Sequence, residues 1–271
     1  MLRMPFAGSL AIAIAIAILP LGAQAPPSSP APGKDLGGPG GIILRPGEKR
    51  PEAQQPPPPS APAPRTADGK PDLSGVWAGA GYTENIAKDM KPGELPMTPW
   101  AEALYKERQA TLGKDDPEAR CLPTGVPRRD PYPFKIVQTP TLVVLLYEGN
   151  VHSYRQIFLD GRGHPKDLDK NWWGDSIGHW EGDTLVVDTV GLNDKTWLDL
   201  SGHPHSDQLH VTERYTRPDY EHVSIQFTLD DPKAYTRPWS VTEVSRMLPN
   251  WEIHEYICNE NNKDVEHLVG K

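Results

Sequence analysis

The chain has 271 residues, and its 36 acidic residues against 28 basic ones give a formal charge of −8 at pH 7. An acidic chain without a basic run binds nucleic acids and anionic membranes poorly, so both classes of partner are excluded. The length allows one large or two small domains, and the number depends on how much of the chain can fold.

Residues 1–25 have the pattern of a secretory signal peptide. Arg3 gives the positive start, residues 10–19 are apolar, and Ala23-Gln24-Ala25 has the small residues of a cleavage site. An uncleaved membrane anchor is the alternative, because residues 6–25 carry no charge. We expect a periplasmic or secreted protein that meets the membrane only through this signal during export.

Residues 26–66 are dominated by Pro, Gly, Ala, Ser and Gln. Such a stretch has too little apolar surface to offset the entropy lost on ordering, which predicts a disordered, extended linker. One globular domain is therefore expected over residues 67–271.

The domain is predicted to open with a strand near residues 72–77, followed by a helix. Thr98 suits the N-cap of that helix and Pro99 its first position, and good helix formers continue to Leu112. Trp100, Ala103 and Leu104 are the expected packed face.

Apolar and β-branched stretches separated by turns at short intervals follow residue 131 and predict a series of strands. Hairpin turns are expected at Gly149-Asn150 and Gly182-Asp183. The remaining strands are expected at residues 134–139, 141–148, 152–160, 176–181, 184–190, 209–217, 222–229, 239–247 and 251–258. Successive hairpins leave exposed edges unless the sheet closes or doubles, so we predict an all-β domain with one helix, folded as an antiparallel up-and-down barrel. A two-sheet β-sandwich is the alternative.

Two resemblances support this fold. Gly75-Val76-Trp77 on the first strand, with Arg246 on a late strand, resembles the lipocalin or calycin pattern, in which an arginine covers a tryptophan at the barrel base. The blocks at residues 68–77, 178–187 and 204–207 resemble a group of uncharacterised exported bacterial proteins. The second resemblance spans residues 66–271 and implies export and a β-rich body, but no activity.

Cys121 and Cys258 are the only two cysteines of the chain. In an exported protein two cysteines most often form one disulfide, which is the pairing we expect. A pair of buried free thiols is the alternative.

Two clusters of polar residues are candidate reactive sites. Asp175, His179 and Glu181 share one parity, so on a regular strand all three face one side, where carboxylates and an imidazole suit acid–base catalysis. A polar outer face of the sheet is the alternative.

The second cluster holds His203, His205 and His210. Imidazoles at this density predict a site for a divalent metal ion, because His is a common ligand of zinc, copper and iron. A solvated loop is the alternative.

The leading functional hypothesis is a barrel that binds a small, partly apolar molecule, with aromatic side chains for contact area and a few charged groups for orientation. The candidate ligand-binding residues are Trp77, Arg155, Trp180, Glu213 and His254. A His/carboxylate or metal-dependent enzyme on the same barrel is one alternative. The other is a protein-interaction module tethered in the envelope, which predicts a wide apolar surface patch.

Overall fold

The computed structural model describes residues 61–79, 84–128, 132–149 and 153–260, all within the second of two compact units, Gly37–Lys271. The expected signal peptide at residues 1–25, most of the expected linker and Asn150 of the expected hairpin turn lie outside the described residues. No helix in the described ranges is both long enough and apolar enough to cross a membrane.

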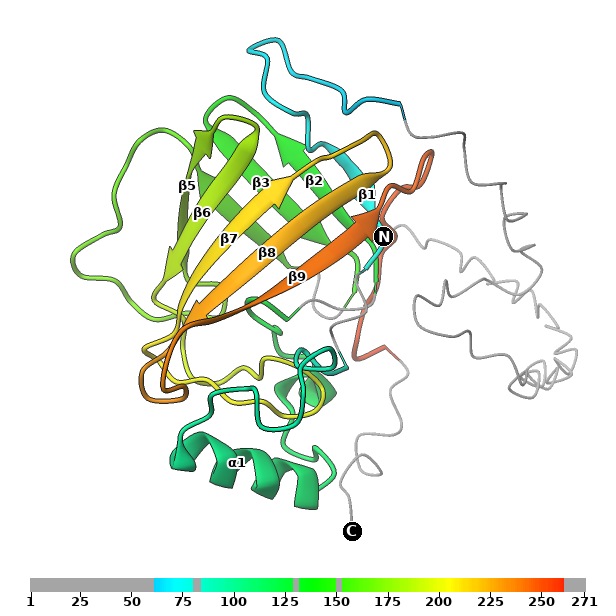
Figure 1. Cartoon of the computed structure of the whole chain (residues 1–271). Helices are drawn as coiled ribbons and strands as arrows, with labels where there is room; N and C mark the ends of the chain where they lie inside the picture. The colour runs from blue at the N-terminus through cyan, green and yellow to red at the C-terminus, as the bar shows by residue number, and fades with distance from the viewer. Residues whose placement is uncertain (1–60, 80–83, 129–131, 150–152, 261–271) are drawn as a thin grey trace, which may run out of the picture. The chain divides into compact units, whose positions relative to one another are not determined.

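Nine strands form a single sheet in which each strand is next to its neighbour in the chain (Figure 1). They are β1 (Gly75–Trp77), β2 (Phe134–Gln138), β3 (Leu142–Tyr147), β4 (Tyr154–Phe158), β5 (Asp175–Glu181), β6 (Thr184–Val190), β7 (His210–Thr216), β8 (His222–Asp230) and β9 (Trp239–Arg246). Neighbouring strands are antiparallel except β4 and β5, which run parallel and share one residue pair, Phe158 with Ile177. The prediction of an antiparallel order is therefore confirmed for every junction but this one.

The first and last strands meet, so the sheet forms a nearly closed barrel. Trp77 lies opposite Met247, and the Ala78 amide donates a hydrogen bond of 2.8 Å to the Arg246 carbonyl. This confirms the barrel rather than the sandwich. The strand expected at residues 251–258 is wrong, because β1 already takes the edge of β9 that this segment would need.

Side chains alternate along each strand between the barrel interior and its outer surface. In β8, Val223, Ile225, Phe227 and Leu229 are buried, while the residues between them are less so. A strand has a side-chain period of two, so this pattern fixes which face of β8 forms the core. At the β5–β6 hairpin, Gly182 adopts a φ of +60°, which glycine reaches without steric cost.

The helix α1 (Pro99–Ala110) begins where predicted, with the Thr98 side chain accepting a hydrogen bond from the Ala101 amide at 3.3 Å. It lies beyond the end of the barrel at which β7 and β9 begin (Figure 1). The expected packed face is wrong for Trp100, which is 38% exposed, and for Ala103, which is exposed, whereas Leu104 is half-buried on the same side as the fully buried Ala101. The Thr98 amide is bound to the Ala234 carbonyl at 2.9 Å, which turns the Ala101 side of the helix inward.

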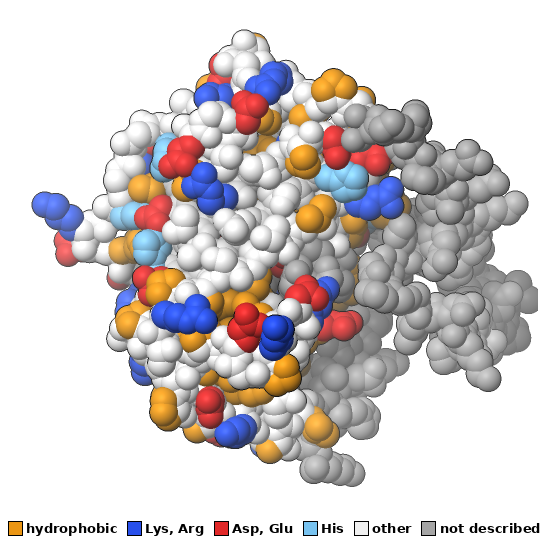
Figure 2. Space-filling view, in the orientation of Figure 1, with side chains coloured by type: hydrophobic (Ala, Val, Ile, Leu, Met, Phe, Trp, Pro, Cys, Tyr) orange, Lys and Arg blue, Asp and Glu red, His pale blue; other side chains and the backbone are white. Residues whose placement is uncertain are grey.

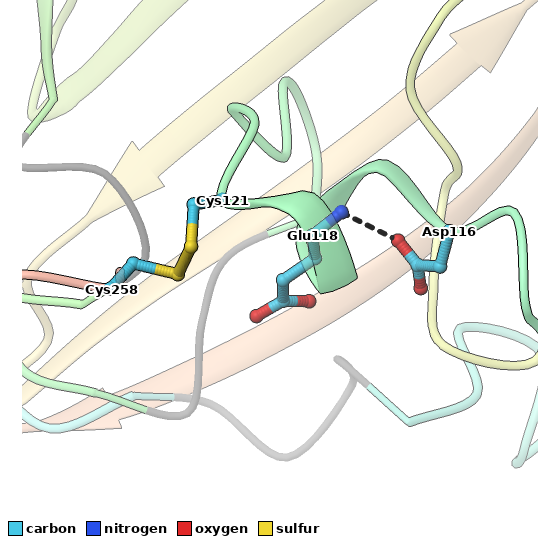
Figure 3. Close-up of a disulfide and its surroundings, with 4 residues drawn as sticks. All are labelled: Asp116, Glu118, Cys121 and Cys258. Atoms are coloured by element: carbon cyan, nitrogen blue, oxygen red, sulfur yellow. Dashed lines mark hydrogen bonds between the residues drawn. A yellow bond between two sulfur atoms is a disulfide. The ribbon is translucent and has the colours of Figure 1, made fainter. Parts of the chain in front are cut away.

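The disulfide between Cys121 and Cys258 is confirmed, with the two Cα atoms 5.7 Å apart (Figure 3). Cys121 directly follows the short 3₁₀ helix η2 (Pro117–Arg120). The Asp116 side chain caps η2 by accepting a hydrogen bond of 3.0 Å from the Glu118 amide, the dashed line in Figure 3. The disulfide thus joins a well-capped turn to the segment after β9.

Candidate functional site

Polar side chains from four consecutive strands meet inside the barrel. Arg155 of β4 binds both carboxylate oxygens of Glu213 on β7, and its Nη1 lies 3.0 Å from Oε1. Arg155 also donates to Ser176 Oγ at 3.1 Å and to Thr189 Oγ1 at 2.7 Å, and the Tyr215 hydroxyl donates to Glu213 at 2.9 Å. The sequence-predicted residues Arg155 and Glu213 are therefore brought together.

Arg155 and Glu213 neutralise each other's charge inside the barrel. Burial acts to lower the pKa of Arg155, but the charge and hydrogen bonds of Glu213 outweigh it and raise that pKa above its ordinary value. Both side chains are at most 3% exposed. The Arg155 guanidinium therefore stays charged and is already paired with the Glu213 carboxylate. This ion pair is suited to a structural role, because it links β4 to β7 across the barrel interior.

An arginine covers the first-strand tryptophan, but it is not the one expected. The guanidinium carbon of Arg217 lies 4.9 Å from the centre of the Trp77 ring, and Trp77 Nε1 donates to the Leu73 carbonyl at 3.0 Å. The prediction of Arg246 is wrong, because residue 246 has the outward parity of β9 and its side chain is exposed. Trp77 itself is fully buried.

A groove of about 360 Å³ lies at this end of the barrel. One wall is the chain that precedes β1, and the others are the start of β6 with its hairpin turn and the turn after β7. Its apolar surface comes from Pro62, Ala63, Pro71 and Pro218. The groove is half open to solvent, and its volume is at the lower end of the range of small-molecule sites in proteins.

The groove also has charged walls, which contacts between distant segments hold in place. Arg65 forms two hydrogen bonds to the Asp183 carboxylate, at 2.9 and 2.6 Å. Arg217, 5% exposed, also lines the groove. The Tyr220 amide donates to the Ala61 carbonyl at 2.8 Å, so residues 61–66, which the sequence assigned to the linker, contact the barrel.

Histidines and aspartates alternate on the outer surface of β5, β6 and β7. His164, from the loop between β4 and β5, is hydrogen-bonded through Nδ1 to Asp175 at 2.5 Å and through Nε2 to Asp188 at 3.0 Å. Asp188 also binds His210 Nε2. In Figure 2, pale blue and red side chains gather over this part of the barrel, at the left of the view. Both ring nitrogens of His164 are engaged, so the cluster fastens the loop to the strands.

The three predicted catalytic residues do share one face, but it is the outer face. His179 and Glu181 lie 3.3 Å apart with side chains 66% and 50% exposed. Arg214 donates to Glu181 at 2.9 Å, and this hydrogen bond, followed by that of His179, lowers the pKa of Glu181. Asp175 instead contacts His164, so the structure separates it from the other two.

The three imidazoles proposed as metal ligands have three separate sets of partners. His203 Nδ1 lies 2.5 Å from the buried carboxylate of Asp199, and its ring stacks on Tyr105. His205 is bound to Thr196 Oγ1 at 2.6 Å and to the Ser206 carbonyl. Within the described residues no group of three or more His, Cys, Asp or Glu side chains is placed to hold a metal ion.

The remaining predicted ligand-binding residues lie apart. Trp180 is partly buried against the core, and the Lys70 ammonium lies 5.8 Å from its ring. His254 is exposed in the segment after β9, where its amide donates to Glu148 at 3.0 Å. Of the predicted ligand-binding residues, Trp77 reaches the groove only through Arg217, which packs on it and lines the groove, and Arg155 and Glu213 form a separate interior pair.

No known family model, curated protein or solved structure matches this chain. The assignment of a site therefore depends on the geometry of the chain itself.

Sequence reasoning missed Arg65, Asp183 and Arg217 of the groove, and His164 and Asp188 of the outer cluster. The parity of β6 places residue 188 on the same face as residue 175 of β5, a signal that could have been found once the hairpin was predicted. The groove and the position of His164 depend on loops packed against distant strands, and no local pattern encodes these contacts.

Proposed function

We propose that this protein is an exported small-molecule-binding protein and that its ligand occupies the groove at the Trp77 end of the barrel. One observation carries the proposal: a formed groove of about 360 Å³ combines proline surface with charged side chains that neighbouring segments fix in position. Ligand sites in proteins typically pair apolar walls with a few well-placed polar groups.

The barrel interior is the weaker place for a ligand. Arg155 and Glu213 satisfy each other there, and a ligand would have to break those contacts. Trp239 Nε1 and Ser245 Oγ are buried without a hydrogen-bond partner among the described residues, but they lie at opposite ends of β9 and do not form one site. The interior therefore serves as the rigid scaffold that positions the groove.

Export to the periplasm or the medium is part of the proposal. The pattern of residues 1–25 supports it. The disulfide supports it independently, because structural disulfides persist in oxidising compartments and are rare in the cytosol.

The test is a ligand screen by saturation-transfer NMR on the full-length product purified from the periplasm, whose mass also reports whether residues 1–25 are removed. The panel holds apolar, phenolic and carboxylic aromatic compounds. Thr184 lines the groove and is only partly buried, so Thr184→Phe is expected to fill the space without disturbing the core. Binding of any hit should fall at least tenfold in this variant.

The matched control is Thr242→Phe, the same substitution at an exposed position of β9 outside the groove. Its affinity for each hit should equal that of the unaltered protein. A panel without hits, or hits that Thr184→Phe does not weaken, would contradict the proposed function.

A further inference from the structure

The guanidinium of Arg217 has an unusual set of partners for a buried cation. Nε donates to the Asp219 carbonyl at 3.3 Å, Nη2 to the Tyr220 carbonyl at 2.6 Å, and Nη1 to the Asp72 carbonyl. All three acceptors are backbone carbonyl groups. A guanidinium has five N–H groups, so two remain, one on each terminal nitrogen.

The side-chain carboxylates of the two aspartates whose backbone carbonyls accept from Arg217 are engaged elsewhere. Asp72 accepts a hydrogen bond from the Ser74 amide at 2.9 Å, and Asp219 binds the His222 ring at 2.9 Å. No ion pair within the described residues includes Arg217. Burial lowers the pKa of Arg217, while the carboxylate charges of Asp72 and Asp219 act against that shift. Arg217 therefore has carboxylates in its surroundings but no carboxylate bonded directly to its guanidinium. Burial of a charge costs free energy, and an anion bonded directly to it would recover part of that cost.

Only one of the two arginines that line the groove has a carboxylate bonded directly to it. Arg65 is neutralised by Asp183 in a two-bond pair, whereas Arg217 has no such partner among the described residues. The side chains that line the groove, two arginines and one aspartate, carry a formal charge of +1, and the carboxylates of Asp72 and Asp219 act on Arg217 from outside this lining.

We propose that the groove selects a small organic carboxylate, whose carboxylate group pairs with the Arg217 guanidinium while its apolar part contacts Pro62, Pro71 and Pro218. This inference rests on the proposed function and names the ligand class of the same site. The guanidinium keeps one N–H on each terminal nitrogen that can donate to a carboxylate, and proline walls favour an organic acid over a small hydrated inorganic anion.

Isothermal titration calorimetry of the full-length protein with 1-naphthoate and with 1-naphthalenemethanol tests the inference, because the two probes share a ring system and differ in charge. Naphthoate should bind at least tenfold more tightly than the alcohol. Arg217→Met should remove that preference. Arg237→Met removes an exposed arginine outside the groove and should leave both affinities unchanged.

Arg217 packs on Trp77, so its replacement could unfold the barrel; circular dichroism checks for this. Thr184→Phe keeps Arg217 in place and provides the second variant. Its affinity for naphthoate should fall at least tenfold.

Three results would overturn the inference in distinguishable ways. Equal binding of the acid and the alcohol, both sensitive to Thr184→Phe, leaves the small-molecule function standing but refutes selection by charge. Inorganic phosphate that binds as tightly as naphthoate shows a general oxyanion site. Failure of every aromatic probe to bind removes both proposals.

Discussion

Asp188 shows how single residues on the outer face respond to pH. Burial acts to raise the pKa of its carboxyl group, but hydrogen bonds from His210 and His164 outweigh burial and hold the pKa below the ordinary value of 3.8. A carboxyl group with a lower pKa in the folded state stabilises the fold above its unfolded pKa. That contribution is lost as the pH falls through the folded pKa.

We therefore predict that Asp188→Asn destabilises the protein at pH 6 and that its stability difference from the unaltered chain shrinks between pH 4 and pH 2. Urea unfolding followed by circular dichroism at each pH measures this difference. Glu255→Gln, at an exposed position, should give a difference within about 0.5 kcal/mol. A difference for Asp188→Asn that stays constant down to pH 2 would refute the prediction.

The alternation of residues along a strand predicts which side chains share a face, but it does not predict which other side chains they contact. The shared face of Asp175, His179 and Glu181 follows from the strand period. Which face is outward depends on how β5 closes into the barrel, and the partner of Asp175 is His164, from a loop. The metal-binding role expected of His203 and His205 likewise depended on their proximity in sequence. In the structure the His203 ring binds Asp199 and the His205 ring binds Thr196.

At the scale of elements, the junction between β4 and β5 is the weakest between consecutive strands, because it has one residue pair while the β3–β4 junction has five. Arg155 compensates from inside the barrel. Its side chain reaches Ser176 on β5, Thr189 on β6 and Glu213 on β7. Side-chain hydrogen bonds thus span the junction where backbone hydrogen bonds are few.

Removing one partner of the Arg155–Glu213 ion pair should lower the free energy of unfolding. Glu213→Gln leaves the buried Arg155 without its counter-ion, and removal of one partner of a buried ion pair costs about 3–5 kcal/mol. The double variant Arg155→Met/Glu213→Leu removes both charges and should cost less than Glu213→Gln alone. Urea unfolding at pH 7 measures both. A cost below about 1 kcal/mol for Glu213→Gln would show that the pair does not hold the junction.

The strands themselves were largely predictable, and the exceptions have physical reasons. Alternating apolar residues place β6 at residues 184–190 and β8 within a residue of its observed bounds. The parallel junction was not foreseen, because the crossing segment at residues 159–174 has no periodic pattern that fixes its path. Residues 251–258 have strand-like composition, but the closed barrel offers them no free edge.

At the scale of the whole molecule, the disulfide constrains the chain more widely than any strand pairing. Cys121 and Cys258 are 137 residues apart, and the loop between them contains every strand from β2 to β9. In the chain-entropy model, closing a loop of this length in the unfolded state stabilises the fold by about 5 kcal/mol. β1, with three residues, lies outside that loop and depends on its contacts with β2 and with the end of β9.

Replacing both cysteines by serine should therefore lower the free energy of unfolding by about 2–5 kcal/mol while leaving the barrel folded, because neither cysteine lies in a strand. Urea unfolding measures the loss, and the far-UV circular dichroism spectrum should be unchanged. A reducing agent should destabilise the unaltered protein to a similar extent and have no effect on the double variant. A loss below about 1 kcal/mol would mean that the unfolded chain is already compact enough for the cross-link to restrict it little.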